Sequence, residues 1–354
     1  MRALRPVPQG MLLAAVLAAA TTACSTSDVD RAAPAPVSTA TVQGDAGQAV
    51  ARRTPIDASL TGKRIAMISF ANNPFWDPVK AGAEAADAEL TSRGARVEYI
   101  TAGPTLDVPT VERALDSAVG QGFDAIGVVP LADGACPAIK RAAAKVPVAT
   151  FIAEGTCSQA SGSKFFRGQP AAEAGAKAAQ AMSETTACKG SVGIITGSFS
   201  VQQHEERRQG FVDKYKELCP DSKIAGTVEN GDDAGKALSA ANDFMTANAD
   251  LSGIYVTAGG PFGAGKAVQQ RGKLGQVAVV AYDFVPQNVE QIRSGVMQAA
   301  IGQDPFGASY DTAVDLYNLL AGGPAPTEYF QPVNVAVMTK ANIDEVLATQ
   351  SGTS

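Results

Sequence analysis

The chain has 354 residues, 45% of them hydrophobic, and a formal charge of −6 at pH 7. This acidic balance, with no basic run in the folded part, excludes nucleic acid and other polyanions as partners. The roughly 295 residues that follow position 59 exceed the usual size of a single core and predict two lobes.

The N-terminus has the pattern of an export signal. Two arginines precede an unbroken apolar run, Met11–Ala20, which is too short to span a bilayer. Thr21-Thr22-Ala23-Cys24 then resembles a bacterial lipobox, although that motif prefers Leu where Thr21 stands. We predict a signal peptide over 1–23, a lipid on Cys24, and an extracytoplasmic protein anchored to the cell membrane. The alternative is a plain signal peptide cut nearby.

Residues 24–59 are rich in Ala, Pro, Ser, Thr and Asp and contain few large apolar side chains. Such a segment buries too little apolar surface to offset the entropy of ordering. We therefore predict a flexible, lipid-anchored tether over 24–59.

From residue 63 onward, short apolar runs alternate with longer amphipathic segments. Strands are predicted over 63–70, 97–100, 125–129, 148–151, 191–196, 224–228, 253–256, 277–282, 298–301 and 333–337. Helices are predicted over 77–90, 108–119, 137–145, 171–185, 204–218, 236–247, 264–271, 286–293 and 307–320. This alternation predicts an α/β fold of two doubly wound parallel-sheet lobes with right-handed crossovers.

Five cysteines are present, and a lipid on Cys24 leaves four in an oxidising compartment, with three connectivities. Cys136 and Cys157 each follow a predicted strand, on one rim of the first lobe. Cys188 and Cys219 each end a predicted helix just before a strand of the second lobe. We therefore predict Cys136–Cys157 and Cys188–Cys219, worth about 3 kcal/mol each. The alternative is unpaired buried thiols.

The turn after the first predicted strand reads Asn72-Asn73-Pro74-Phe75-Trp76. Ligands of such sheets sit beyond the carboxyl ends of the strands, and two facing lobes place the site in the cleft between them. An aromatic face suits the C–H face of a sugar or polyol, and amides suit its hydroxyls. The alternative is that Phe75 and Trp76 only pack the first helix.

On this turn and three later motifs, the chain resembles the type I periplasmic sugar-binding proteins, the ribose-binding-protein-like branch of ABC-importer solute receptors. The similarity covers nearly all of residues 62–340. It implies the periplasmic-binding-protein-like I fold, with two lobes joined by a multi-strand hinge. The expected lobes are 60–165 plus 304–323 and 166–303 plus 324–350.

The resemblance also implies the ligand contacts. The first turn contributes Asn73, Phe75 and Trp76. The motifs Glu205–Phe211, Val279–Asp283 and Ile301–Pro305 contribute Arg207, Asp283 and Gln303, and Asp283 is expected to accept two sugar hydroxyls. Thr257 stands where the family has Asn.

Two departures from the family bear on the ligand. The Asp-Arg pair that follows the fourth strand is absent from Thr150–Glu154, and a sugar-contacting Arg is replaced by Glu205. Glu154 and Glu205 are either acceptors for hydroxyls or ordinary surface charges. More acceptors and fewer cations favour a neutral, hydroxyl-rich ligand such as a linear polyol over a phosphorylated or carboxylate one.

No cofactor or metal is expected. Gly260–Ala267 nearly matches a phosphate-binding loop, but Ala267 replaces the required Ser/Thr. His204, the only histidine, is expected at a helix cap or rim. We predict a monomeric receptor, not an enzyme, that delivers a neutral sugar or polyol to an ABC permease in the membrane. The alternatives are a ligand-sensing subunit for a membrane sensor and, more remotely, an enzyme acting on a small polyhydroxy compound.

Overall fold

The computed structural model describes residues 42–47, 51–103 and 106–350, which all belong to one compact unit. The predicted signal peptide, the lipidation site Cys24 and the first part of the predicted tether lie outside the described residues. None of the described helices is both long and apolar enough to cross a membrane.

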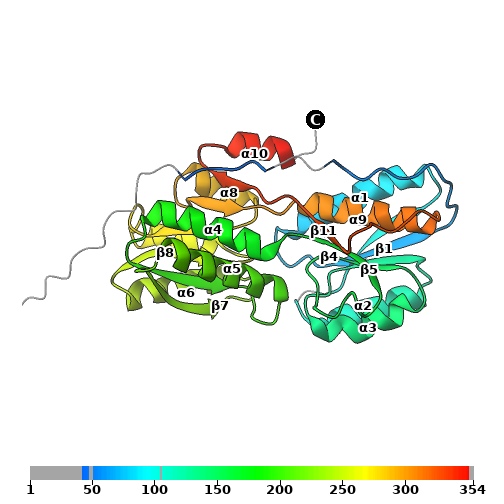
Figure 1. Ribbon diagram of the computed structural model, residues 1–354, viewed down its shortest axis with the longest axis horizontal. Coiled ribbons are helices and arrows are strands. Elements are labelled where there is room, and N and C mark those ends of the chain that lie inside the picture. Colours follow the sequence, from blue (N-terminus) through cyan, green and yellow to red (C-terminus); the bar gives the residue numbers. More distant parts are fainter. Residues whose placement is uncertain (1–41, 48–50, 104–105, 351–354) are drawn as a thin grey trace, which may run out of the picture. The chain divides into compact units, whose positions relative to one another are not determined.

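The first lobe is built on a six-stranded parallel sheet (Figure 1). Its strand order is β11-β5-β4-β3-β1-β2, and every neighbouring pair is parallel, which confirms the predicted sheet type. The strands are β1 (Arg64–Ser69), β2 (Arg96–Thr101), β3 (Ala125–Val128), β4 (Val148–Ile152), β5 (Ser163–Gly168) and β11 (Phe330–Pro332).

Helices pack around this sheet because the apolar faces of the helices and of the sheet must be buried against each other. They are α1 (Trp76–Thr91), α2 (Val108–Gly120), the 3-10 helix η1 (Asp133–Ala135), α3 (Cys136–Ala143) and α9 (Pro305–Leu320). The closest helix pair here is α1 and α9, where Gly82 allows the approach: a Cβ at this position would lie 2.3 Å from the Phe306 carbonyl oxygen.

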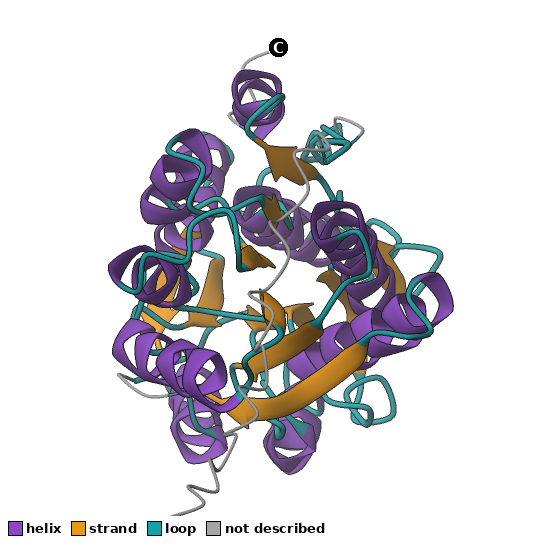
Figure 2. Ribbon diagram, turned by 90° about the vertical axis from the view of Figure 1, so that its left-hand side faces the viewer, coloured by secondary structure: helices purple, strands orange, loops and turns teal. Residues whose placement is uncertain are grey.

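The second lobe repeats the plan with the order β12-β10-β9-β8-β6-β7. Its strands are β6 (Ser191–Thr196), β7 (Lys223–Glu229), β8 (Leu251–Val256), β9 (Ala278–Tyr282), β10 (Ala299–Ile301) and β12 (Val337–Thr339), with only β12 antiparallel among these pairings. Its helices are α4 (Ala171–Thr186), α5 (Gln202–Leu218), α6 (Ala234–Ala247), α7 (Phe262–Gln270), α8 (Pro286–Arg293) and α10 (Ile343–Gln350). Helices flank the strands on both sides (Figure 2).

From β1 onward, the described part of the chain passes from one sheet to the other three times, as a multi-strand hinge requires. The crossings follow β5, β10 and β11. Two predicted boundaries are corrected: β5 stays in the first sheet to Gly168, and β11 belongs to that sheet rather than to the second lobe. The strand predicted over 333–337 is also wrong, because this apolar stretch is a crossing between two short strands.

The tether predicted to reach residue 59 is wrong for its described part, residues 42–47 and 51–59, here called the N-terminal strap. Val42 is buried in the second-lobe core, and Asp45 pairs with Val337 of β12. Lys177 of α4 binds the Asp45 carboxylate at 2.9 Å. The beginning of the strap therefore packs on the second lobe.

The later part of the strap binds α9 of the first lobe through two arginines. Arg52 donates to Asp304 at 2.8 and 3.0 Å and to Asp311 at 3.2 Å, and Arg53 binds Asp315 at 2.8 Å. These three carboxylates are buried. Composition alone missed the strap because ion pairs and backbone pairing, rather than apolar bulk, hold it in place.

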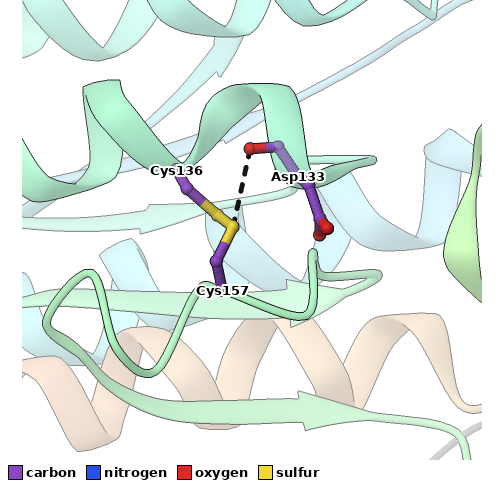
Figure 3. Close-up of side chains that lie close together, drawn as sticks. All are labelled: Asp133, Cys136 and Cys157. Atoms are coloured by element: carbon purple, nitrogen blue, oxygen red, sulfur yellow. Dashed lines mark hydrogen bonds between the residues drawn. A yellow bond between two sulfur atoms is a disulfide. The ribbon is translucent and has the colours of Figure 1, made fainter.

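Both predicted disulfides are present: Cys136–Cys157 in the first lobe and Cys188–Cys219 in the second. Figure 3 shows the first, with Cys157 Sγ 3.5 Å from the carbonyl oxygen of Asp133. The Asp133 carboxylate accepts hydrogen bonds from the amide and the hydroxyl of Thr156 at 2.6 and 2.7 Å. Because both sulfurs are bonded to each other, this cluster offers no thiolate to a metal ion.

Replacing Cys188 and Cys219 together by Ser is expected to lower the free energy of unfolding by about 3–4 kcal/mol. The bridge closes a loop with a sequence separation of 31 residues, whose entropy the unfolded chain would regain. Urea unfolding of the oxidised wild type and the double variant measures the difference. A wild type that is equally stable with and without reductant would contradict this expectation.

Candidate functional site

A small cavity lies at the carboxyl ends of the two sheets and is lined by both lobes. Its volume is about 40 Å³. The first lobe contributes Asn73, Phe75, Trp76, Leu106, Val129, Leu131, Ile152 and Ala153, and the remainder of the chain contributes Val201, Gln203, His204, Arg207, Asp232, Ala258, Gly259, Asp283 and Gln303. Six of the nine predicted ligand contacts are among these residues: Asn73, Phe75, Trp76, Arg207, Asp283 and Gln303.

The aromatic pair occupies the first-lobe side. Asn73 Oδ1 accepts a hydrogen bond from the Phe75 amide at 2.9 Å, which fixes the turn before α1. The Phe75 and Trp76 rings meet edge to face, with centroids 5.0 Å apart. Both rings also belong to the first-lobe core, so they pack the helix and line the cavity at once. Trp76 Nε1 is buried and has no hydrogen-bond partner among the described residues.

Arg207 is the centre of the polar network. Its guanidinium donates to Gln169 Oε1 at 3.0 Å, to the Thr257 carbonyl at 3.1 Å and to Gln303 Oε1 at 2.8 Å, and its Cζ lies 4.2 Å from the Tyr282 ring centroid. Because all three acceptors are neutral, these hydrogen bonds leave the positive charge of Arg207 uncompensated.

Two carboxylates, the buried Asp283 and the half-buried Asp232, supply the opposite charge. Gln303 Nε2 donates to Asp283 Oδ1 at 2.7 Å, and the Gly259 amide donates to Asp232 Oδ1 at 2.9 Å. Burial raises the pKa of both carboxyls from 3.8 to about 6, although the charge of Arg207 opposes the shift. The cavity thus pairs one cation with two carboxylates that are ionised at neutral pH.

Sequence reasoning missed Asp232. Its signal was the Asn230-Gly231-Asp232 turn that directly follows the strand predicted over 224–228, at the same sheet edge as Asp283. Polar turn residues at the carboxyl end of a parallel strand are cleft candidates. Asp232 and Asp283 both have positive φ angles, 59° and 73°, which non-glycine residues seldom adopt.

His204 lines the cavity from the first turn of α5 and is half-buried, which agrees with the expected position at the helix start or rim. It lies one helical turn before Arg207, on the same face of α5. Burial and then the charge of Arg207 lower the pKa of His204 to about 3, so the ring is neutral at physiological pH. Its Nδ1 accepts a hydrogen bond from the Ser198 amide at 3.2 Å, which leaves the proton on Nε2 as a donor.

Thr257 does not line the cavity. Its side chain is fully buried, and its hydroxyl lies 3.0 Å from the Thr196 hydroxyl. Its contribution is the carbonyl oxygen that accepts from Arg207. The prediction of a direct ligand contact is therefore corrected to a positioning role.

Glu154 and Glu205 also lie outside the cavity. Glu154 accepts a hydrogen bond from the Tyr329 hydroxyl at 2.8 Å, and Tyr329 directly precedes the edge strand β11, which the sequence did not predict. Glu205 pairs with Arg208 on the outer side of α5. Positions two apart on a helix do not share a face, so Glu205 turns away where Arg207 turns inward.

Asp232→Asn is expected to change the pH dependence of stability. Since burial raises the pKa of Asp232 to about 6, the folded chain binds more protons than the unfolded chain between pH 3.8 and 6. The contribution of this group to the free energy of unfolding therefore falls as pH rises across that window. The free energy of unfolding of the variant should equal that of the wild type below pH 4 and exceed it by about 2–3 kcal/mol above pH 6.

Urea unfolding of both proteins at pH 4, 5, 6 and 7 measures this difference. Asn retains the acceptor for the Gly259 amide, so that hydrogen bond is matched between the two proteins. A stability difference that stays constant across the pH range would contradict the raised pKa.

Two lobes with a polar cavity between them define a solute-binding receptor. Residues 65–324 match the family described as the periplasmic binding protein domain, and the chain belongs to that family. The type I fold and the parallel α/β lobes are those predicted from the sequence.

Relatives of known specificity share this plan. The chain is 25% identical over 242 residues to the D-allose-binding periplasmic protein of Escherichia coli (strain K12), covering 66% of this chain and 76% of that protein. An ABC transporter solute-binding protein from Agrobacterium vitis with bound D-fucose is 25% identical, with a TM-score of 0.74 over 82% of this chain and 99% of that one. Another from Agrobacterium vitis, bound with α-D-tagatopyranose, is 26% identical, with a TM-score of 0.72 over 79% and 96%.

Proposed function

We propose that the chain captures a neutral sugar or polyol between its lobes, outside the cytoplasm, and delivers it to an ABC permease. The observation that carries this proposal is the cavity in which Asp283, Arg207 and Gln303 face Phe75 and Trp76. Carboxylate, guanidinium and amide groups pair with hydroxyls, and the aromatic rings cover the C–H face of a sugar. The relatives named for D-allose, D-fucose and D-tagatopyranose support a sugar ligand.

Capture couples to the arrangement of the lobes. Asn73 and Trp76 belong to the first lobe and Asp283 to the second, so one ligand that binds all three favours the closed arrangement. The three crossings of the hinge let the lobes move while the chain stays continuous. A closed, loaded receptor is the state that a permease can distinguish from an empty one.

The signal peptide over 1–23 and the lipid on Cys24 remain proposals for export and anchoring. They agree with a family whose relative is named as periplasmic. We propose a monomer that acts by binding and not by catalysis. A sensor subunit is less favoured, because the relatives are named as transporter solute-binding proteins.

A thermal-shift screen of pentoses, hexoses, tetritols, pentitols and inositols tests the function. A ligand at 100 times its dissociation constant should add about 2.7 kcal/mol of stability. Trp76 is the only tryptophan of the chain and lines the cavity, so its fluorescence should change with the same ligand. No response to any neutral sugar or polyol would refute the proposed ligand class, and turnover of the bound sugar would refute the non-catalytic role.

A further inference from the structure

The first-lobe wall of the cavity is almost entirely apolar. Six of its lining residues carry no polar side-chain atom: Phe75, Leu106, Val129, Leu131, Ile152 and Ala153. Ile152 ends β4 and Ala153 follows it, within the stretch Thr150–Glu154 from which the Asp-Arg pair is missing. Among the described lining residues of this lobe, polar side-chain groups come only from Asn73 and Trp76.

Backbone strain accompanies two of these apolar residues. Leu131 and Ile152 have φ angles of 67° and 66°, in the left-handed region that disfavours side chains with a Cβ. For a β-branched residue such as Ile152 this conformation is a marked outlier. Strain of this kind persists at ligand sites where the surrounding structure holds it. Both residues end up at the cavity, 5% and 6% exposed, so the fold maintains an apolar surface there at a conformational cost.

The opposite wall is polar. Arg207, Asp232 and Asp283 lie on the second-lobe side, and His204 adds a neutral ring with a donor on Nε2. A ligand between the two walls therefore meets acceptors and donors on one side and hydrocarbon on the other. A hydroxyl that faced Leu131 and Ile152 would lose its water without gaining a protein partner, which weakens affinity roughly 10- to 100-fold.

We propose that the ligand is a deoxy sugar, whose methyl or methylene carbon packs on Leu131 and Ile152 while its hydroxyls face Asp232, Asp283 and Arg207. This inference rests on the proposed function and narrows its substrate class. Trp76 adds a second element of selectivity: its buried, unpartnered Nε1 donates to a ring or hydroxyl oxygen of the sugar. An unsubstituted linear polyol, with a hydroxyl on every carbon, does not fit the apolar wall.

Matched sugar pairs that differ by one hydroxyl test the proposal. Isothermal titration compares D-fucose with D-galactose, L-rhamnose with L-mannose, and 2-deoxy-D-ribose with D-ribose. In at least one pair the deoxy sugar should bind 10-fold or more tightly than its hydroxylated partner. If the hydroxylated sugar binds equally or better in every pair that binds, the deoxy proposal fails and the sugar receptor stands. If none of the six sugars binds, the deoxy proposal fails, and the proposed function fails with it only if the thermal-shift screen also finds no sugar or polyol.

Two variants of Ile152 separate polarity from shape. The Thr and Val side chains have nearly the same volume and are both β-branched, so the two variants share the strain of the positive φ at position 152. Ile152→Thr places a hydroxyl on the apolar wall and should reduce the preference for the deoxy sugar by about 10-fold. Ile152→Val should keep the preference of the wild type. Equal preferences in the two variants would show that this wall does not select the ligand.

Discussion

Arg207→Ala is expected to weaken sugar binding at least 100-fold and to lower the free energy of unfolding by about 2–4 kcal/mol. The side chain is 3% exposed and makes three hydrogen bonds. Its positive charge also lowers the pKa values of Asp232 and Asp283, against the rise that burial causes. Without it, the buried Asp283 and the half-buried Asp232 lose the nearby positive charge, and the amide and carbonyl oxygens that bound Arg207 lose their donor.

The position of Arg207 explains why the effect on binding should exceed that of an ordinary contact. Gln169 lies in the crossing after β5 and Gln303 in the crossing after β10, and the guanidinium bonds to both. Gln303 in turn donates to Asp283. Arg207 therefore orients the principal acceptor of the site and ties two hinge segments together, so its loss disturbs both the contacts and the closure.

Isothermal titration and urea unfolding of Arg207→Ala measure the two effects. Arg208→Ala is the matched control, because Arg208 is the next residue of α5 but pairs with Glu205 at the surface. The control should bind the sugar as tightly as the wild type does, and its free energy of unfolding should fall by less than about 1 kcal/mol. Arg207→Lys keeps the positive charge but loses the planar set of guanidinium N–H donors. We expect it to recover part of the lost stability without restoring tight sugar binding. Undiminished affinity in Arg207→Ala would contradict the assigned role.

Much of the architecture could be predicted because parallel strands buried on both faces leave a strong apolar signal. β3 and β4 are completely buried and were found, as were all the strands of the second-lobe centre. The edge strand β11 and its neighbour β5 were missed. β11 is only three residues long, and its pairing with β5 depends on a crossing that no local pattern encodes.

The site divides in a similar way. The resemblance to the sugar-binding family pointed to Asn73, Asp283 and Gln303, and all three line the cavity because each lies in a turn at a strand end. Glu154 and Glu205, for which an ordinary surface charge was the alternative, lie outside the cavity, because their placement depends on which way a side chain points rather than on where its motif lies. The apolar character of the first-lobe wall also escaped prediction, since Leu131 and Ile152 face the cavity only through positive φ angles that the sequence does not reveal.

The N-terminal strap supplies the second large effect. Arg52→Ala is expected to lower the free energy of unfolding by about 2–4 kcal/mol at neutral pH, because it leaves Asp304 and Asp311 buried without the cation that binds both. These side chains are 6% and 2% exposed, respectively. The loss should shrink as the pH is lowered, because burial raises the pKa of Asp311 above 3.8 and its protonation removes the charge that Arg52 compensates.

Arg53→Ala is the matched control for this prediction. Asp315, the partner of Arg53, also binds Arg167, so one cation remains after the substitution. Arg53 is 44% exposed, and a loss below about 1 kcal/mol is expected. Urea unfolding at pH 7.5 and pH 5 compares the two variants with the wild type, and equal losses in both would contradict a specific role for Arg52.

A substitution on the other side of the contact gives an independent check. A Cβ at Gly307 would lie 1.5 Å from Arg52 Nη1, so Gly307→Ala must displace the arginine from the start of α9. It should therefore reproduce most of the loss caused by Arg52→Ala, and the double variant should lose little more than either single one. Additive losses would show that the two substitutions act separately.

Asp304, which Arg52 binds, directly follows Gln303 of the cavity, so the strap supports the hinge at the segment that carries a proposed ligand contact.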